Sequence, residues 1–272
     1  MAEALRTKGE PASILLSFDT EEFDLPREHG VEISLEQGMK VSAEGTNRIL
    51  DILKQNQVKA TFFCTANFAT NAPQVIKRIL DEGHEVASHG VDHWQPKETD
   101  CATSKEILEQ VCNCQVHGYR EPRMLPVNDQ EIERSGYLYN SSLHPAFIPG
   151  RYMHLNMPRT PFFKGKVLQI PASVFPGIRL PLFWLACHHY PQWLYHRLCT
   201  WTMSHDGLFV IYFHPWEFIT LGNHPEWNIP YIIRHNSGKE MEQRLDRLIK
   251  TFKSHKASFV TYSQYVQDKW PQ

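Results

Sequence analysis

The stretch Ser13-Ile14-Leu15-Leu16-Ser17-Phe18-Asp19-Thr20-Glu21-Glu22 decides the fold. Its apolar half predicts a buried strand, and its acidic half places carboxylates where that strand ends. Residues 58–64 and 84–88 read as two further strands, and stretches with apolar residues at helical spacing lie between the strands. Strands that alternate with helices predict a parallel sheet with right-handed crossovers, either open or closed into a barrel.

The alternation continues to the end of the chain. Further strands are expected over 116–119, 208–213 and 258–261, and helices over 73–80, 104–111, 129–135, 193–204, 239–252 and from about Ser42 onward. Asn128 is expected to cap the short helix that stops at Gly136. A proline- and aromatic-rich segment, about 145–195, has no role that its pattern reveals. No repeat or linker is visible, so residues 1–272 are expected to form a single catalytic domain with a core at about 13–265 and a short N-terminal extension.

The composition excludes some classes of protein. The chain has 272 residues, of which 42% are hydrophobic and 21% charged, and its formal net charge is −2. Without a long basic block, a nucleic-acid-binding surface is not expected. The first six residues lack the apolar segment of a secretory signal, which predicts a cytoplasmic protein whose six cysteines stay reduced.

Chemically active side chains follow four of the expected strands. Asp19, His89, Arg120 and His214 each stand directly after an apolar run or at its end. In a parallel barrel, catalytic residues lie at the carboxyl ends of the strands. These four side chains are therefore expected to converge in space.

Two histidines indicate a metal site. In Ser88-His89-Gly90-Val91-Asp92-His93 the two imidazoles are four residues apart, and Glu21 or Glu22 offers a carboxylate oxygen. Two nitrogens and one oxygen form a ligand set that leaves a coordination position open for water. The sequence thus predicts a metal-dependent hydrolase.

Such a hydrolase also needs a base and an acid. Asp19 could serve as the base, and Arg120 could orient it and keep it ionised through a charge-assisted hydrogen bond. Arg120 could instead pair with Glu121 on the surface. His214 could protonate the leaving group.

Four motifs in order carry a resemblance to a known family. Ser17-Phe18-Asp19-Thr20-Glu21-Glu22, Ser88-His89-Gly90-Val91-Asp92-His93, Tyr119-Arg120-Glu121-Pro122 and Tyr212-Phe213-His214-Pro215-Trp216-Glu217 resemble the motifs of the polysaccharide deacetylases with the NodB homology domain (carbohydrate esterase family 4). The similarity is to the branch with an extended acidic first motif and a His-Pro-Trp late motif. It covers about residues 13 to 265.

The resemblance implies an α/β fold, a distorted (β/α) barrel, and one divalent metal, Zn²⁺ or else Co²⁺ or Ni²⁺. It implies removal of an acetyl group from an N-acetylated (or O-acetylated) sugar. By position, Asp19 would be the base, Arg120 its tether and His214 the acid. The metal ligands would be Glu21, His89 and His93, and a backbone N–H near Arg123 would help to hold the oxyanion.

Two residues depart from the family pattern. The metal carboxylate is a glutamate where the family mostly has aspartate, so the choice between Glu21 and Glu22 stays open. Arg123 stands where the family prefers an aromatic residue, and at the rim it could bind a phosphate or carboxylate of the substrate. Tyr212 and Trp216 could be sugar-binding platforms or core residues.

The substrate is expected to be a cell-envelope or surface-polysaccharide precursor, nucleotide- or lipid-linked. The apolar run 178–195 is too interrupted by proline and histidine to span a bilayer. It could be a flap that contacts a membrane surface or a lipid-linked sugar. The alternative is a packed outer helix of the barrel.

Two other functions compete with deacetylation. One is hydrolysis of a linear or cyclic C–N amide bond outside sugars, with or without a metal. The other is an inactive carbohydrate-binding barrel. Acetate release, ring opening, and sugar binding without turnover distinguish the three.

Overall fold

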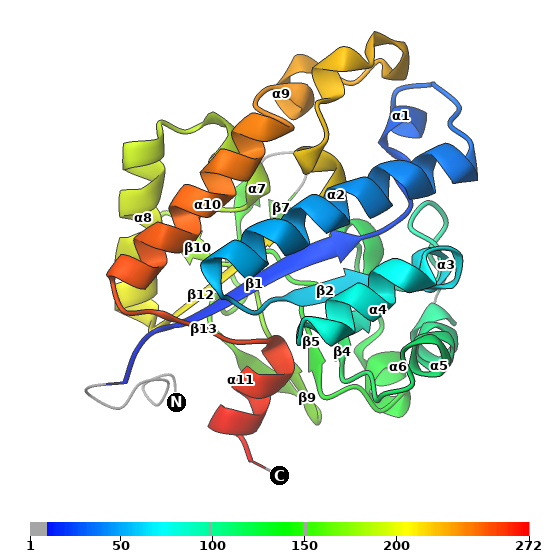
Figure 1. Cartoon of the computed structure of the whole chain (residues 1–272). Coiled ribbons are helices and arrows are strands. Elements are labelled where there is room, and N and C mark those ends of the chain that lie inside the picture. The colour runs from blue at the N-terminus through cyan, green and yellow to red at the C-terminus, as the bar shows by residue number, and fades with distance from the viewer. Residues whose placement is uncertain (1–9, 98, 149–151, 272) are drawn as a thin grey trace.

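A curled sheet forms the centre of the structure (Figure 1). In the computed structural model, which describes residues 10–97, 99–148 and 152–271, the strands run in the order β12-β1-β2-β3-β4-β5-β9-β8, with β13 also paired to β1. β8 joins β9 antiparallel, and the other pairings in this sheet are parallel. This curled, mostly parallel sheet confirms the expected distorted (β/α) barrel. The expected N-terminal extension lies largely outside the described residues.

The bounds of the sheet strands are β1 (Ser13–Thr20), β2 (Thr61–Cys64), β3 (Glu85–Ser88), β4 (Gly118–Tyr119), β5 (Tyr139–Asn140), β8 (Phe162–Lys164), β9 (Val167–Gln169), β12 (Leu208–Phe213) and β13 (Ser258–Phe259). Two hairpins pair β6 (Phe147–Ile148) with β7 (Tyr152–Met153) and β10 (Val174–Phe175) with β11 (Leu180–Pro181). The strands expected from the sequence are confirmed, whereas those between residues 139 and 181 are additional.

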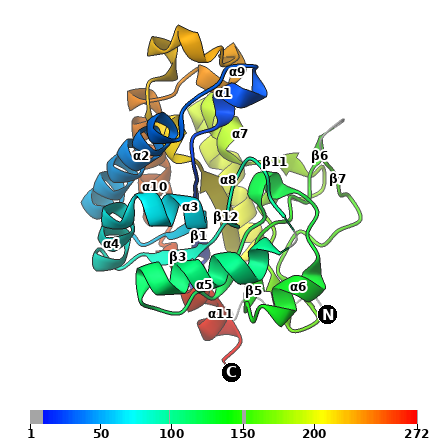
Figure 2. The same ribbon diagram turned by 90° about the vertical axis from the view of Figure 1, so that its right-hand side faces the viewer.

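Helices cover the outside of the sheet. In Figure 1, α2 (Leu35–Asn56), α4 (Pro73–Asp81) and α10 (Lys239–Ser254) lie across β1 and β2, and α5 (Asp100–Cys112) faces the viewer in Figure 2. The remaining helices are α1 (Leu25–Glu28), α3 (Ala66–Asn71), α6 (Asp129–Arg134), α7 (Trp184–His189), α8 (Gln192–Asp206), α9 (Tyr231–Arg234) and α11 (Tyr262–Lys269). Four 3-10 turns, η1 (Pro122–Met124), η2 (Pro215–Phe218), η3 (Leu221–Asn223) and η4 (Pro225–Trp227), lie among them.

Helix α2 begins earlier than expected. The prediction placed its start near Ser42, but the helix begins at Leu35, after Ser34. The Ser34 hydroxyl accepts from the Gln37 amide at 3.2 Å, and the Gln37 side chain accepts from the Ser34 amide at 3.3 Å. This reciprocal capping box satisfies two amides that the first turn leaves unpaired.

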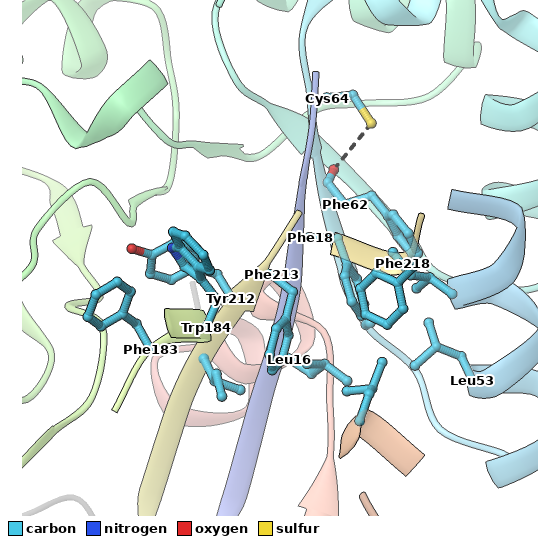
Figure 3. Packing of buried hydrophobic residues seen from close by; sticks show 14 of the residues in the cluster. Leu16, Phe18, Leu53, Phe62, Cys64, Phe183, Trp184, Tyr212, Phe213 and Phe218 are labelled. Carbon is cyan, nitrogen blue, oxygen red and sulfur yellow. Dashed lines mark hydrogen bonds between the residues drawn. The ribbon is translucent and has the colours of Figure 1, made fainter. Parts of the chain in front are cut away.

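The alternation of side chains along the strands creates two cores. Phe18 stacks on Phe62 at 5.1 Å on the face that the helices cover. Phe63, the next residue of β2, instead packs edge-on against Tyr262 at 5.3 Å inside the barrel. Figure 3 shows the same division, with Phe18 and Phe62 on one side of the strands and Tyr212 on the other. Since neighbouring residues face opposite sides, Ser17 and Asp19, on either side of Phe18 in β1, point into the barrel.

The apolar run 178–195 is largely packed into the molecule. Trp184, Cys187 and His188 of α7 are buried, while Ile178 and Trp193 are exposed. This burial favours the outer-helix interpretation over a membrane flap. Among the described residues, no helix has the length and apolar character that crossing a membrane requires.

A close approach between α2 and η2 fixes the segment that follows β12. A methyl group at Gly45 would lie 2.0 Å from the carbonyl oxygen of Pro215. We therefore expect Gly45→Ala to lower the free energy of unfolding by about 1–3 kcal/mol, because backbone has to move. Urea denaturation measures this, with Gly222→Ala as the control since nothing lies within 4 Å of its added methyl. Equal stability of the two variants would contradict the packing described.

Candidate metal centre and active site

A cavity of about 780 Å³ lies at the carboxyl ends of the strands. It collects side chains from distant parts of the sequence, since parallel strands end at the same edge of the sheet. Eight of the nine site residues expected from the sequence line it: Asp19, Glu21, His89, His93, Arg123, Tyr212, His214 and Trp216. The ninth, Arg120, is fully buried beside Asp19.

Arg120 and Asp19 form a buried ion pair. The guanidinium donates to the Asp19 carboxylate at 2.5 Å and to the Ser17 hydroxyl at 3.0 Å. It also donates to the carbonyl of Ser141 at 3.1 Å and to the Tyr262 hydroxyl at 3.0 Å. Partners on β1, after β5 and on α11 thus hold this arginine in one orientation, and the arginine holds Asp19 at the cavity wall.

The surface pairing of Arg120 with Glu121 is not observed. Glu121 accepts instead from the Tyr119 hydroxyl at 2.7 Å. Burial raises the pKa of Glu121, although the bond from Tyr119 opposes this effect. Glu121 therefore belongs to the support behind the cavity wall.

Glu21, His89 and His93 meet at one point, and all three are buried. The Nε2 atoms of His89 and His93 lie 3.2 and 3.1 Å from Oε2 of Glu21. The opposite ring nitrogens are engaged: Nδ1 of His89 bonds the carbonyl of Arg120 at 2.8 Å, and Nδ1 of His93 bonds Asp24 at 2.8 Å. These outer contacts place the proton of each neutral ring on Nδ1.

The arrangement suits a cation. With Nδ1 protonated, each neutral imidazole turns the lone pair of Nε2 toward Glu21, whose Oε2 is buried and receives no hydrogen bond. Burial alone would raise the pKa of Glu21, yet His93 and His89 lower it to about 2. Burial would lower the pKa of His93, but Glu21 and Asp24 raise it to about 9. The cluster therefore attracts positive charge, either a proton or a metal ion.

Glu22 has a different environment. Its Oε2 accepts from the Thr65 hydroxyl at 2.9 Å, and burial raises its pKa. The three-residue cluster contains Glu21 and not Glu22. Of the two carboxylates that the sequence left open, the structure brings Glu21 to the histidines.

His214 stands on another side of the cavity. Its Nδ1 lies 2.9 Å from Oε1 of Glu217, and its ring stacks on Trp216 at 4.9 Å. Burial opposes protonation, but Glu217 and then Glu21 raise the pKa of His214. Glu217 follows His214 by three residues in the 3-10 turn η2, a spacing that the sequence interpretation passed over. His188 on α7 also bonds Glu217, but the sequence pattern indicates only that it belongs to the apolar run 178–195.

The rim cations are already paired. Arg123 bonds Glu28, and its guanidinium lies 5.2 Å from the centre of the Trp94 ring. Lys164 bonds Asp129 in the same way at the cavity edge. An anionic substrate group would therefore compete with carboxylates for both cations.

Comparison with known proteins relates part of this chain to a known family. Residues 8–125 match the family model described as polysaccharide deacetylase. A peptidoglycan-N-acetylglucosamine deacetylase of Listeria monocytogenes is 38% identical over 104 residues, which are 35% of this chain and 22% of that protein. An uncharacterised 30.6 kDa protein of Geobacillus stearothermophilus is 25% identical over 82% of this chain and 66% of its own length. The matches thus span less than two thirds of these relatives.

Solved structures share the architecture. A Mycobacterium smegmatis protein described as a polysaccharide deacetylase has a TM-score of 0.66 at 18% identity, covering 97% of this chain and 92% of its own. The PuuE allantoinase gives a TM-score of 0.66 at 16% identity, covering 98% of this chain and 94% of its own. These likenesses show the fold. The sequence match over residues 8–125 relates that part of the chain to the polysaccharide deacetylases.

Proposed function

We propose that this chain is a metal-dependent hydrolase that removes an acetyl group from an N-acetylated, or O-acetylated, sugar. The observation that carries the proposal is the convergence of Glu21, His89 and His93 in the cavity that Asp19 and His214 also line. Zn²⁺ suits a set of two imidazoles and one carboxylate, and Co²⁺ or Ni²⁺ suits the nitrogens too. A bound divalent ion would polarise the acyl carbonyl and acidify the attacking water.

The side chains supply the proton transfers. Asp19 takes the proton of the attacking water at Oδ2, because Arg120 holds Oδ1. His214 delivers a proton from Nε2 to the leaving nitrogen or oxygen, since Nδ1 is directed at Glu217. Arg123 and Met124 both have an uncommon left-handed backbone, with φ of 59° and 52°. The amides of Met124 and Leu125 donate to the carbonyls of Glu121 and Pro122, so we assign the oxyanion-binding N–H to Arg123.

The finer description of the substrate is also a proposal. We infer a cell-envelope or surface-polysaccharide precursor from the names of the deacetylases that parts of the chain match, which act on peptidoglycan. Arg123 recognises an anionic group only where that group displaces Glu28. The cytoplasmic location, the single catalytic domain, and a nucleotide or lipid link in the substrate stay predictions.

A cyclic-amide hydrolase is the second candidate, and the observation that favours it is the allantoinase with the same TM-score as the deacetylase neighbour. The inactive barrel is the third, since a Bacillus anthracis pseudoenzyme of carbohydrate esterase family 4 also shares the fold, with a TM-score of 0.54. A screen of the Zn²⁺-, Co²⁺- and Ni²⁺-loaded protein separates the three. It measures acetate release from N-acetylglucosamine oligomers and UDP-N-acetylglucosamine, and ring opening of allantoin. Ring opening without acetate release would replace the deacetylase by the second candidate.

The metal assignment has a matched pair of variants. We expect about one equivalent of bound metal in the wild type, none retained by Glu21→Gln after dialysis, and one retained by Glu22→Gln. The reason is that Glu21 meets both histidines, whereas Glu22 bonds Thr65. Elemental analysis of the dialysed proteins is the measurement. Metal retained by Glu21→Gln and lost by Glu22→Gln would transfer the role to Glu22.

A further inference from the structure

A second histidine lies behind the proposed acid. Nε2 of His188 is 2.9 Å from Oε2 of Glu217, whose other oxygen is 2.9 Å from Nδ1 of His214. His188 and Glu217 are both fully buried. The rings of His188 and His214 lie 5.6 and 5.4 Å from that of Trp184, which meets both edge-on. The three polar groups therefore form one hydrogen-bonded triad, and water does not reach its inner end at His188.

The hydrogen bonds fix how many protons the triad of His188, Glu217 and His214 contains. Nδ1 of His188 lies 2.8 Å from the carbonyl oxygen of His235, which only accepts, so Nδ1 carries a proton. A hydrogen bond between Nε2 of His188 and Glu217 then needs one more proton, on the ring or on the carboxyl group. A neutral His188 facing an ionised Glu217 would set two acceptors 2.9 Å apart.

The donors around Glu217 favour its ionised form. Its Oε1 accepts the backbone N–H of His214 at 2.6 Å and faces Nδ1 of the same ring. Hydrogen bonds donated to a carboxylate stabilise the charged form. The extra proton therefore belongs on His188, which makes it an imidazolium.

Other ionisable groups surround this triad. On the inner side, burial raises the pKa of Cys187 and Tyr195, which keeps both neutral beside Glu217. The charged or titratable neighbours from the other packed elements are Arg244 and Arg247 of α10, His189 and His235 near His188, and Asp19 and Glu21 on the cavity side of His214. His188 contacts Glu217 directly and can carry a positive charge, as His214 does on the other carboxylate oxygen.

We propose that His188 is the cationic partner of Glu217 and, through it, a positioning residue that sets the acid strength of His214. The inference rests on the proposed role of His214 as the acid. An ionised carboxylate shared with a second cation stabilises the protonated form of His214 less than an unshared one does. His188 thus keeps His214 from holding its proton too tightly to give it up.

Removing the positive charge of His188 shifts the pKa of His214 in a defined direction. In His188→Gln the amide still donates to Glu217, but the positive charge is gone. The pKa of His214 should then rise by about one unit, because Glu217 is left to that ring alone. If acetate release needs the protonated His214, the alkaline limb of kcat against pH moves up with it, while kcat on the plateau falls several-fold and KM stays the same.

The test is a nitrogen-15 NMR titration of the histidine rings in the full, Zn²⁺-loaded chain. We expect both nitrogens of wild-type His188 to be protonated at pH 7, and the titration of His214 to shift upward in His188→Gln. His189→Gln is the matched control, since its ring is exposed and hydrogen-bonds the carbonyl of Ile232 rather than Glu217. A neutral His188 in the wild type, or an unshifted His214 in the variant, would overturn the proposal.

Two further measurements keep the outcomes separate. Should His188→Gln not fold, the wild-type spectrum alone decides the charge of His188, and His188→Asn replaces the variant. Acetate release is followed in parallel. A shifted His214 together with no turnover on any acetylated sugar would refute the deacetylase function and leave the charge relation between His188 and His214 standing.

Discussion

Asp19→Asn should lower kcat/KM for acetate release by about a thousandfold, the scale of a lost general base. An amide oxygen cannot take the proton of the attacking water. Metal content should not change, because Asp19 lies outside the cluster of Glu21, His89 and His93. Steady-state rates and elemental analysis of the same preparation test both statements.

The control for this change is Asp51→Asn. Asp51 is exposed on α2 and pairs with Arg78, so the substitution removes the same charge without touching the cavity. We expect wild-type rates from it. Activity retained by Asp19→Asn would mean that another group takes the proton, and the assignment of Asp19 as the base would be wrong.

Arg120→Met is expected to cost about 3–5 kcal/mol of the free energy of unfolding, the largest stability loss of any change considered. The substitution leaves the buried Asp19 without its cation and removes the donors to Ser17, Ser141 and Tyr262. It also empties the space over the ring of Phe63, 3.9 Å from the guanidinium carbon. Urea denaturation at pH 7 measures the loss.

The double variant Asp19→Asn, Arg120→Met separates the contribution of the ion pair to stability from that of the other contacts of Arg120. Replacing both partners of a buried pair costs less than removing one, because no unpaired charge stays behind. We therefore expect the double variant to be more stable than Arg120→Met alone. If the two are equally stable, the hydrogen bonds to the barrel wall, rather than the charge of Asp19, make Arg120 necessary.

The parts of the site that follow regular strands could be predicted from the sequence. Asp19, His89, Arg120 and His214 were placed at strand ends, and the structure gathers them because parallel strands share one carboxyl edge. Local spacing was sufficient for this step, since an apolar run and the polar residue after it are adjacent in the chain.

The supports of these residues could not be predicted in the same way. Tyr262 reaches Arg120 from α11, a helix that the sequence interpretation did not include, and Ser141 follows the two-residue strand β5. Strands this short have no periodicity to detect. The hydrogen bond from Arg120 to Tyr262 spans 142 positions, and the one to Ser141 spans 21 positions between the ends of β4 and β5. No local pattern encodes either separation.

Sequence patterns also missed the importance of two polar neighbours of His214, the proposed acid. In the sequence, Glu217 is visible only as part of a motif, and His188 lies in a run whose apolar character hides its polar role. A buried histidine is recognised as functional from its partners, and those partners are known only once α7 and η2 are in contact with each other. The signal in the sequence was the three-residue step from His214 to Glu217.

The pairing of β1 with β12 aligns Phe18 with Phe213. The residues that come next are Asp19 and His214, so this one strand register brings the proposed base and the proposed acid to matching positions. Loop insertions around the cavity can therefore alter which molecules enter while the two proton-transfer groups keep their spacing. A library that varies the loops after β5 and β9, and leaves β1 and β12 intact, would search for new specificities while Asp19 and His214 keep their positions.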